Sequence, residues 1–208
     1  YVLKLAGIQK IILSLVLSPV IALATGYLVM IAMLWGFGRF APSLLNTGFR
    51  RMQLLSASMM SFSHGSNDAQ KAMGIITLAL LSAGHIPALE VPIWVKLACA
   101  LSMGLGTAAG GWKIIKTMGT RIFRLEPING FAADLNSALV IFGATFLHLP
   151  VSTTHVVSGS IMGVGAAKRV TAVRWSTARQ MVFAWLLTIP ASGLTSAATY
   201  ILLKLLFL

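Results

Sequence analysis

Two uncharged apolar runs constrain this chain more than any other feature of its sequence. One covers residues 11–38, which is 28 residues, and the other covers residues 180–203, which is 24 residues. A helix of about 20 apolar residues is long enough to cross the hydrocarbon core of a bilayer. Only 10% of the residues are charged, whereas a soluble domain carries about 25%. The sequence therefore predicts an all-α membrane protein, because a soluble helical core would need polar helix faces that these segments lack.

The distribution of charged residues also indicates a membrane topology. Its formal net charge is +12, and the basic residues gather in short stretches between the apolar runs, at 39–51, 113–124 and 168–179. Cytoplasmic loops of membrane proteins carry such an excess of Lys and Arg, so we place these stretches in the cytoplasm. Topology thus explains the positive charge, and no nucleic-acid partner is expected. The predicted location is the cell membrane, as a multi-pass protein surrounded by lipid in a prokaryotic plasma or inner membrane.

About six transmembrane segments are expected, at 11–37, 52–89, 93–115, two within 127–167, and 180–203. Segment 52–89 is too long for one straight span, because 38 helical residues would extend about 57 Å across a core of about 30 Å. We expect it to be broken, strongly tilted or partly outside the membrane, with the break at Gly65. Segment 127–167 is interrupted at 148–155 and forms either two spans, which its length favours, or a re-entrant hairpin.

Two polar stretches interrupt these segments, Ser66-Asn67-Asp68 and Ser152-Thr153-Thr154-His155. A carboxylate within a membrane segment indicates a functional site, and irregular backbone at that depth must be buried or line a cavity. Each stretch precedes a helical run, and the N–H groups of a helix N-terminus bind anions. Asn67 and Asp68 instead offer hard oxygen ligands to a cation such as Na⁺, or a proton site at Asp68. The pattern predicts cotransport of an anion and a cation near broken helices.

Several of these residues have structural alternatives. Asp68 could be a helix N-cap paired with Lys71 one turn later, and His64 could be structural or handle protons. His155 could likewise be structural or have a functional role at the site. Asp134 lies in another apolar stretch and could pair with a loop Lys or Arg or serve a second cation site.

Small residues and the single cysteine are interpreted as packing features. Gly106 with Gly110 and Gly159 with Gly163 form G-x-x-x-G pairs, a spacing that suits close helix packing in lipid. Cys99 has no partner for an internal disulfide or a metal site. We therefore expect no cofactor, and no metal beyond a coupling Na⁺ at Asn67 and Asp68.

The polar stretches also carry a resemblance to a known family. FSHGSNDAQKAMG at 62–74 and PVSTTHVVSGSIMG at 150–163 resemble the two signatures of the inorganic phosphate transporter (PiT) family. GGWKIIKTMG and FAWLLTIPAS resemble its intervening and closing segments. The resemblance implies symport of inorganic phosphate with Na⁺ or H⁺ through two repeats of inverted topology. Asn67 and Asp68 match the first signature, and Ser152, Thr153, Thr154 and His155 match the second.

This chain has one copy of each signature where the family has two, and it corresponds to the second repeat. We expect residues 1–208 to be a single transmembrane transporter domain, the C-terminal half of a longer two-repeat protein. Its partner would be the first-repeat half or, alternatively, another copy in a homo-oligomer. The phosphate-binding residues are expected to be Ser66, Ser152, Thr153, Thr154 and His155, with the coupling cation at Asn67, Asp68 and Asp134.

The expected function is a secondary transporter, with an uncoupled anion channel as the alternative. A hydrolase built on Ser152 or His155 is not expected, because the sequence contains no convincing Ser–His–Asp set and no metal-ligand cluster.

Overall fold

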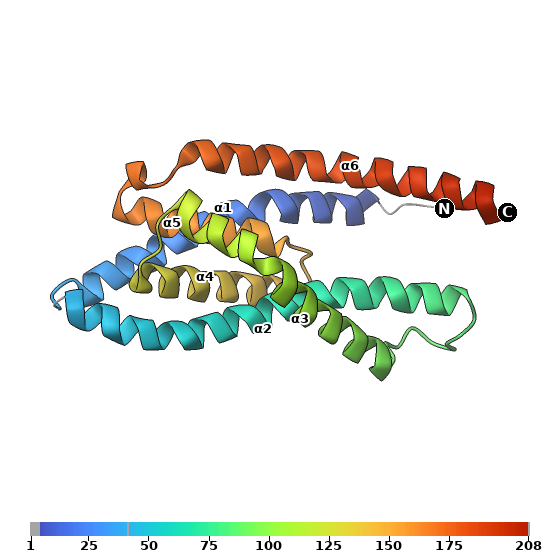
Figure 1. Cartoon of the computed structure of the whole chain (residues 1–208), viewed down its shortest axis with the longest axis horizontal. Coiled ribbons are helices and arrows are strands. Elements are labelled where there is room, and N and C mark those ends of the chain that lie inside the picture. The colour runs from blue at the N-terminus through green and yellow to red at the C-terminus, as the bar shows by residue number, and fades with distance from the viewer. Residues whose placement is uncertain (1–4, 41, 208) are drawn as a thin grey trace. The chain divides into compact units, whose positions relative to one another are not determined.

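The computed structural model describes residues 5–40 and 42–207, and every regular element in this part of the chain is helical. The chain divides into two compact units, residues 1–173 and residues 174–208. The elements of the first unit are α1 (Leu5–Phe37), α2 (Pro42–Ser82), α3 (Ile93–Lys116), the π-helical turn η1 (Thr117–Ile122), α4 (Pro127–Phe146), α5 (Thr153–Lys168) and the 3₁₀ turn η2 (Val170–Ala172) (Figure 1). The second unit is α6 (Trp175–Phe207).

The predicted all-α class is confirmed, and each expected segment coincides with a helix. Among the described residues, three helical stretches are long and apolar enough to cross a membrane by length and composition alone, at Gly7–Phe37, Ile93–Ile122 and Trp175–Leu206. Helices α4 and α5 are shorter, with 20 and 16 residues. The interrupted segment 127–167 is therefore a pair of helices joined by a loop.

Helix α2 corrects one expectation. It runs for 41 residues without a break (Figure 1), so the break predicted at Gly65 is wrong, and Ser66, Asn67 and Asp68 lie inside a helix and do not cap one. Asn67 and Asp68 disfavour helix interiors when their side chains compete for nearby backbone groups. Here both side chains bond to other side chains instead, to Thr145 and Thr153 respectively. At 1.5 Å per residue α2 is about 60 Å long, so it is tilted or extends beyond a bilayer.

The loop between α4 and α5 is closed at both ends by local hydrogen bonds. At the end of α4, Leu149 N–H donates to Ala144 C=O over 2.8 Å and His148 N–H donates to Thr145 C=O over 3.0 Å. His148 has a φ of 53°, so these bonds form a Schellman motif with histidine in the usual glycine place. At the start of α5, Ser152 Oγ accepts the His155 N–H over 3.4 Å as an N-cap. The predicted interruption and the hydroxyl-rich helix start are both confirmed.

Glycines let α1 and α5 approach until their backbones touch. A Cβ added at Gly159 would collide with the carbonyl oxygen of Pro19, and one at Gly163 would collide with that of Leu23. The packing expected of this G-x-x-x-G pair is therefore confirmed. Asn136 of α4 lies at the same junction, where its Nδ2 donates to Ala22 C=O over 2.9 Å and to Ser160 Oγ over 2.8 Å. These contacts join α1, α4 and α5 around a buried centre.

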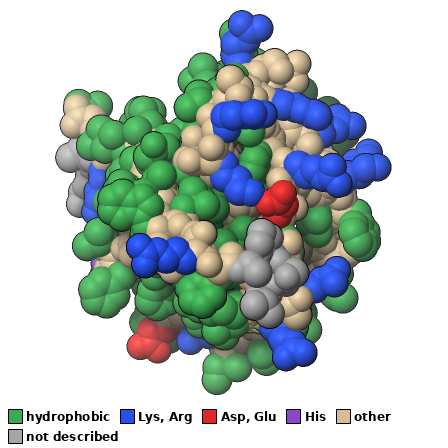
Figure 2. Space-filling view, turned by 90° about the vertical axis from the view of Figure 1, so that its left-hand side faces the viewer, with side chains coloured by type: hydrophobic (Ala, Val, Ile, Leu, Met, Phe, Trp, Pro, Cys, Tyr) green, Lys and Arg blue, Asp and Glu red, His purple; other side chains and the backbone are tan. Residues whose placement is uncertain are grey.

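Figure 2 shows several Lys and Arg side chains on the face that it presents. One acidic residue, Glu126, precedes α4 and pairs with Lys168 near the end of α5, with 2.5 Å between Nζ and Oε2. This hydrogen bond holds the pKa of the Glu126 carboxyl below its usual value. The pair ties the outer ends of the α4–α5 hairpin together.

Candidate functional site

A cavity of about 290 Å³ lies where the middle of α2 meets the start of α5. Two residues of α2 line it, Asp68 and Lys71, together with Ile11 and Leu15 of α1 and residues 150–154 of the hairpin. The two polar stretches singled out from the sequence are about 85 residues apart, and most of their members meet in this one cavity. The cavity is therefore the candidate site.

Asp68 is the centre of the polar contacts around this cavity. Its Oδ1 accepts a hydrogen bond from Lys71 Nζ over 2.8 Å, and its Oδ2 accepts one from Thr153 Oγ1 over 2.9 Å. His64 Nε2 lies 3.5 Å from the same Oδ2. The carboxylate thus joins α2 to the first turn of α5, a tertiary role that an N-cap would not have.

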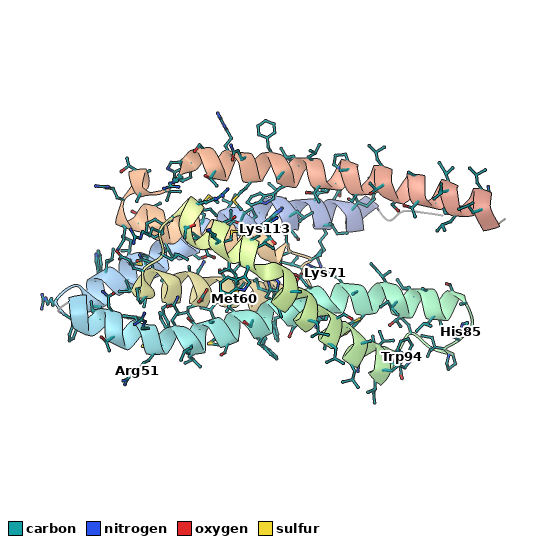
Figure 3. The ribbon with its side chains drawn as sticks, in the orientation of Figure 1. Arg51, Met60, Lys71, His85, Trp94 and Lys113 are labelled. Carbon is teal, nitrogen blue, oxygen red and sulfur yellow. The ribbon has the colours of Figure 1, made fainter. Side chains whose placement is uncertain are left out.

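Lys71 was considered from sequence only as a partner of Asp68, and the structure gives it a second contact. Its Nζ also donates to the backbone carbonyl of Val151 over 2.9 Å, so one ammonium bridges α2 and the hairpin loop. Figure 3 labels Lys71 where α2 passes this loop. The spacing of three residues from Asp68 was the sequence signal for the ion pair. No local signal indicated Val151, which lies 80 residues away.

Asn67 does not line the cavity, and its side chain lies in the contact between α2 and α4. Its side chain is buried, with 6% of the residue surface exposed, and its Nδ2 donates to Thr145 Oγ1 over 2.9 Å. The buried Oδ1 accepts no hydrogen bond from any described residue. An amide oxygen left in this state retains its full capacity to bind a cation or a donor. Thr145 was missed by the sequence reasoning, because it lies in a helix that gave no motif.

The start of α5 contributes hydroxyl residues to the lining of the cavity. Ser152 and Thr154 both line it, and Thr154 is exposed. The first N–H groups of an α-helix have no partner within the helix, so this turn can bind an anion. The His155 side chain does not line this cavity, and its backbone N–H serves the cap.

Two further residues expected at the site also lie outside the cavity. Ser66 lines a separate groove of about 1100 Å³ between α2 and α3, which Thr154 borders from the other side. Asp134 accepts a hydrogen bond from Ser56 Oγ over 3.5 Å, and within residues 5–40 and 42–207 it forms no ion pair with a Lys or Arg. The structure therefore does not bring either residue into contact with Asp68.

The direction of the helices sets the distance between Asp134 and the cavity. Ser56 contacts Asp134 and Asn67 contacts Thr145, and both pairs are 78 residues apart, so α2 and α4 run in the same direction. Eleven residues separate the two levels along each helix, which is about 16 Å. A single cation cannot bridge that distance, so Asp134 could serve only a second cation site.

Comparison with known proteins identifies relatives along nearly the whole chain. The sequence model of the phosphate transporter family matches residues 2–196. A Bacillus subtilis protein named "Probable low-affinity inorganic phosphate transporter" is 50% identical over 206 residues, which are 99% of this chain and 62% of that protein. A Rhizobium meliloti protein of the same name is 45% identical over 195 residues, covering 93% of this chain and 58% of that protein.

A solved structure entitled "The sodium-dependent phosphate transporter" has a similar fold. It superimposes with a TM-score of 0.70 and 35% sequence identity, over 80% of this chain and 42% of that one. The chain thus spans about three fifths of the length of the two relatives and less than half of the solved structure.

Proposed function

The chain belongs to the phosphate transporter family, and from this premise we propose that it forms part of a secondary transporter that moves inorganic phosphate by symport with Na⁺ or H⁺. The observation that carries the proposal is the cavity that joins Asp68 to the hydroxyl-rich start of α5. One face of this cavity offers donors to an anion, and the other offers a carboxylate to a cation.

Phosphate binds, in this proposal, at the first turn of α5. Ser152 and Thr154 donate their hydroxyl protons to phosphate oxygens, and the N-terminus of α5 adds the partial positive charge of a helix end. Lys71 lines the same cavity and contributes a full positive charge. Donors from a rigid helix start suit an oxyanion, because they point to one place without reorganisation.

The coupling cation binds at Asp68 with the buried Oδ1 of Asn67 as a further oxygen ligand. A multiply charged anion in a site of low dielectric is costly unless opposite charge lies beside it. A cation next to phosphate lowers that cost, and each then raises the affinity of the site for the other. The solved structure of similar fold is entitled a sodium-dependent phosphate transporter, and this supports Na⁺ as the coupling ion in the proposal. Asp134, about 16 Å away along the helices, is proposed only for a second cation.

Loss of both hydroxyls at the start of α5 tests the phosphate site. We expect the double variant Ser152→Ala, Thr154→Val to lower the apparent phosphate affinity at least tenfold, because each hydrogen bond to a charged group contributes about 1.5–3 kcal/mol. Uptake of radiolabelled phosphate by the full two-repeat protein in proteoliposomes measures this. Ser58→Ala is the control, because Ser58 is exposed and bonds to Leu54 C=O of its own helix. If the double variant keeps the phosphate affinity of the parent, phosphate does not bind in this cavity.

The length of the relatives motivates a test of completeness. We propose that this chain is one half of a two-repeat transporter, so the 208 residues alone should not accumulate phosphate in proteoliposomes. Co-reconstitution with the first-repeat half should restore uptake. Gradient-driven uptake by the 208-residue chain alone would instead indicate a homo-oligomer. If an imposed cation gradient does not drive phosphate accumulation in proteoliposomes that contain the complete protein, the uncoupled channel is favoured.

A further inference from the structure

The ammonium group of Lys71 occupies the position that a cation bound to Asp68 would need. It lies 2.8 Å from Oδ1, while Thr153 occupies Oδ2 and His64 lies 3.5 Å from that oxygen. Both carboxylate oxygens therefore already have partners. A Na⁺ ion at Oδ1 would sit within a few ångströms of the ammonium nitrogen, and two like charges at that distance repel strongly.

The contacts of Lys71 allow it to leave this position. Its side chain is 46% exposed and lies on the cavity surface, so it is not locked by packing. Four rotatable side-chain bonds carry an ammonium with three donors, and two of these donors are used by Asp68 and Val151. The same cavity contains Ser152 and Thr154, where the proposed phosphate site lies.

We propose that Lys71 is an exchangeable counter-charge: it neutralises Asp68 when the cation site is empty, and Na⁺ displaces it so that it binds phosphate. The inference rests on the proposed function of this cavity. It gives a physical route for coupling, since the arrival of Na⁺ at Asp68 releases a positive charge beside the phosphate. The ion pair also prevents Asp68 from remaining as an unpaired carboxylate in the empty site.

In this exchange, Lys71 has opposite effects on the affinity for Na⁺ and on the affinity for phosphate. Lys71 competes with Na⁺ for Asp68, so its removal should strengthen Na⁺ binding. It also binds phosphate once displaced, so its removal should weaken phosphate binding even when Na⁺ is saturating. A lysine that served only to fasten α2 to the hairpin loop through Val151 would weaken both, because its loss would loosen the whole cavity.

The test is Lys71→Met in the full two-repeat protein, since methionine keeps much of the length and removes the charge. We expect half-maximal activation of phosphate uptake at about tenfold lower Na⁺ and an apparent phosphate affinity about tenfold weaker at saturating Na⁺, the size of one charged hydrogen bond. Calorimetric titration with Na⁺ alone should show the same gain in Na⁺ affinity, which keeps the test valid if the variant does not transport. Lys71→Arg retains the positive charge, so it should not show the gain in Na⁺ affinity expected of Lys71→Met. Lys168→Met removes a lysine from an ion pair outside the cavity and should change neither affinity.

Three results would decide against the exchange. If Lys71→Met weakens Na⁺ and phosphate binding together, Lys71 is a structural tether. If it changes neither, Lys71 does not take part. If phosphate binding by the parent is independent of Na⁺, no Na⁺ displaces Lys71, although uptake driven by a proton gradient would leave the proposed function standing. A parent that binds no phosphate at all would overturn the proposed function itself.

Discussion

Asp68→Asn is expected to abolish gradient-driven accumulation of phosphate, with uptake at least a hundredfold below the parent. Asparagine keeps the shape of the side chain and can still accept the hydrogen bond from Thr153. It removes the negative charge that pairs with Lys71 and that would bind the coupling cation. Each hydrogen bond to a charged group contributes about 1.5–3 kcal/mol. A neutral amide offers an oxygen to Na⁺ but no negative charge to offset it, and it cannot take up and release a proton.

Uptake of radiolabelled phosphate by the full two-repeat protein in proteoliposomes, under imposed Na⁺ and pH gradients, measures this effect. Glu126→Gln is the matched control. Glu126 also pairs with a lysine, but it lies outside the cavity and is largely exposed, and exposed ion pairs contribute about 0–1 kcal/mol. If Asp68→Asn still concentrates phosphate with the cation dependence of the parent, Asp68 is a structural residue and the coupling proposed here is wrong.

Gly163→Ala is expected to destabilise the folded protein severely. The new methyl group would collide with the backbone carbonyl of Leu23, which cannot move aside as a flexible side chain can. Overpacking of this kind costs about 1–3 kcal/mol and sometimes more, and here it would force α1 and α5 apart. We expect a lower melting temperature in detergent, followed by circular dichroism, and a lower yield of monodisperse protein.

Gly106→Ala and Gly110→Ala are matched controls on the other G-x-x-x-G pair. Nothing lies within 4 Å of a Cβ added at either position in the described structure. Alanine is better than glycine inside a helix by about 0.5–1 kcal/mol, so these variants should be as stable as the parent or slightly more stable. Equal losses of stability at positions 106 and 163 would contradict the contact between α1 and α5 described above.

The sequence predicted the helices well because long apolar runs, prolines and loop charges are local signals. The loop at 147–152 was predictable for the same reason, because Pro150 and the N-cap Ser152 are local signals of a helix start. The break at Gly65 was predicted wrongly for a physical reason. Local propensity disfavours Asn67 and Asp68 inside a helix, and the partners that stabilise them, Thr145 and Thr153, lie 78 and 85 residues away.

The sequence indicated which polar stretches form the candidate site, but it did not determine every residue that lines the cavity. The residue types indicated an anion and a cation, and the structure places Asp68 beside Ser152, Thr153 and Thr154. Whether Ser66 or Asp134 joins them depends on the face that α2 turns toward α5 and on the register between α2 and α4. Both are tertiary properties, and a single sequence carries no direct signal for them.

The backbone contact between α1 and α5 has a consequence for movement. A carrier exposes its site to one side of the membrane at a time, and this requires parts of the protein to rock against each other. The backbones of α1 and α5 are in close contact at Gly159 and Gly163, so we expect the two helices to move together. Phosphate bound at the first turn of α5 would then move together with α1 and α5. The hydrogen bonds of α2 at Asp68 and Lys71 can break and reform, so we expect relative motion between α2 and the start of α5.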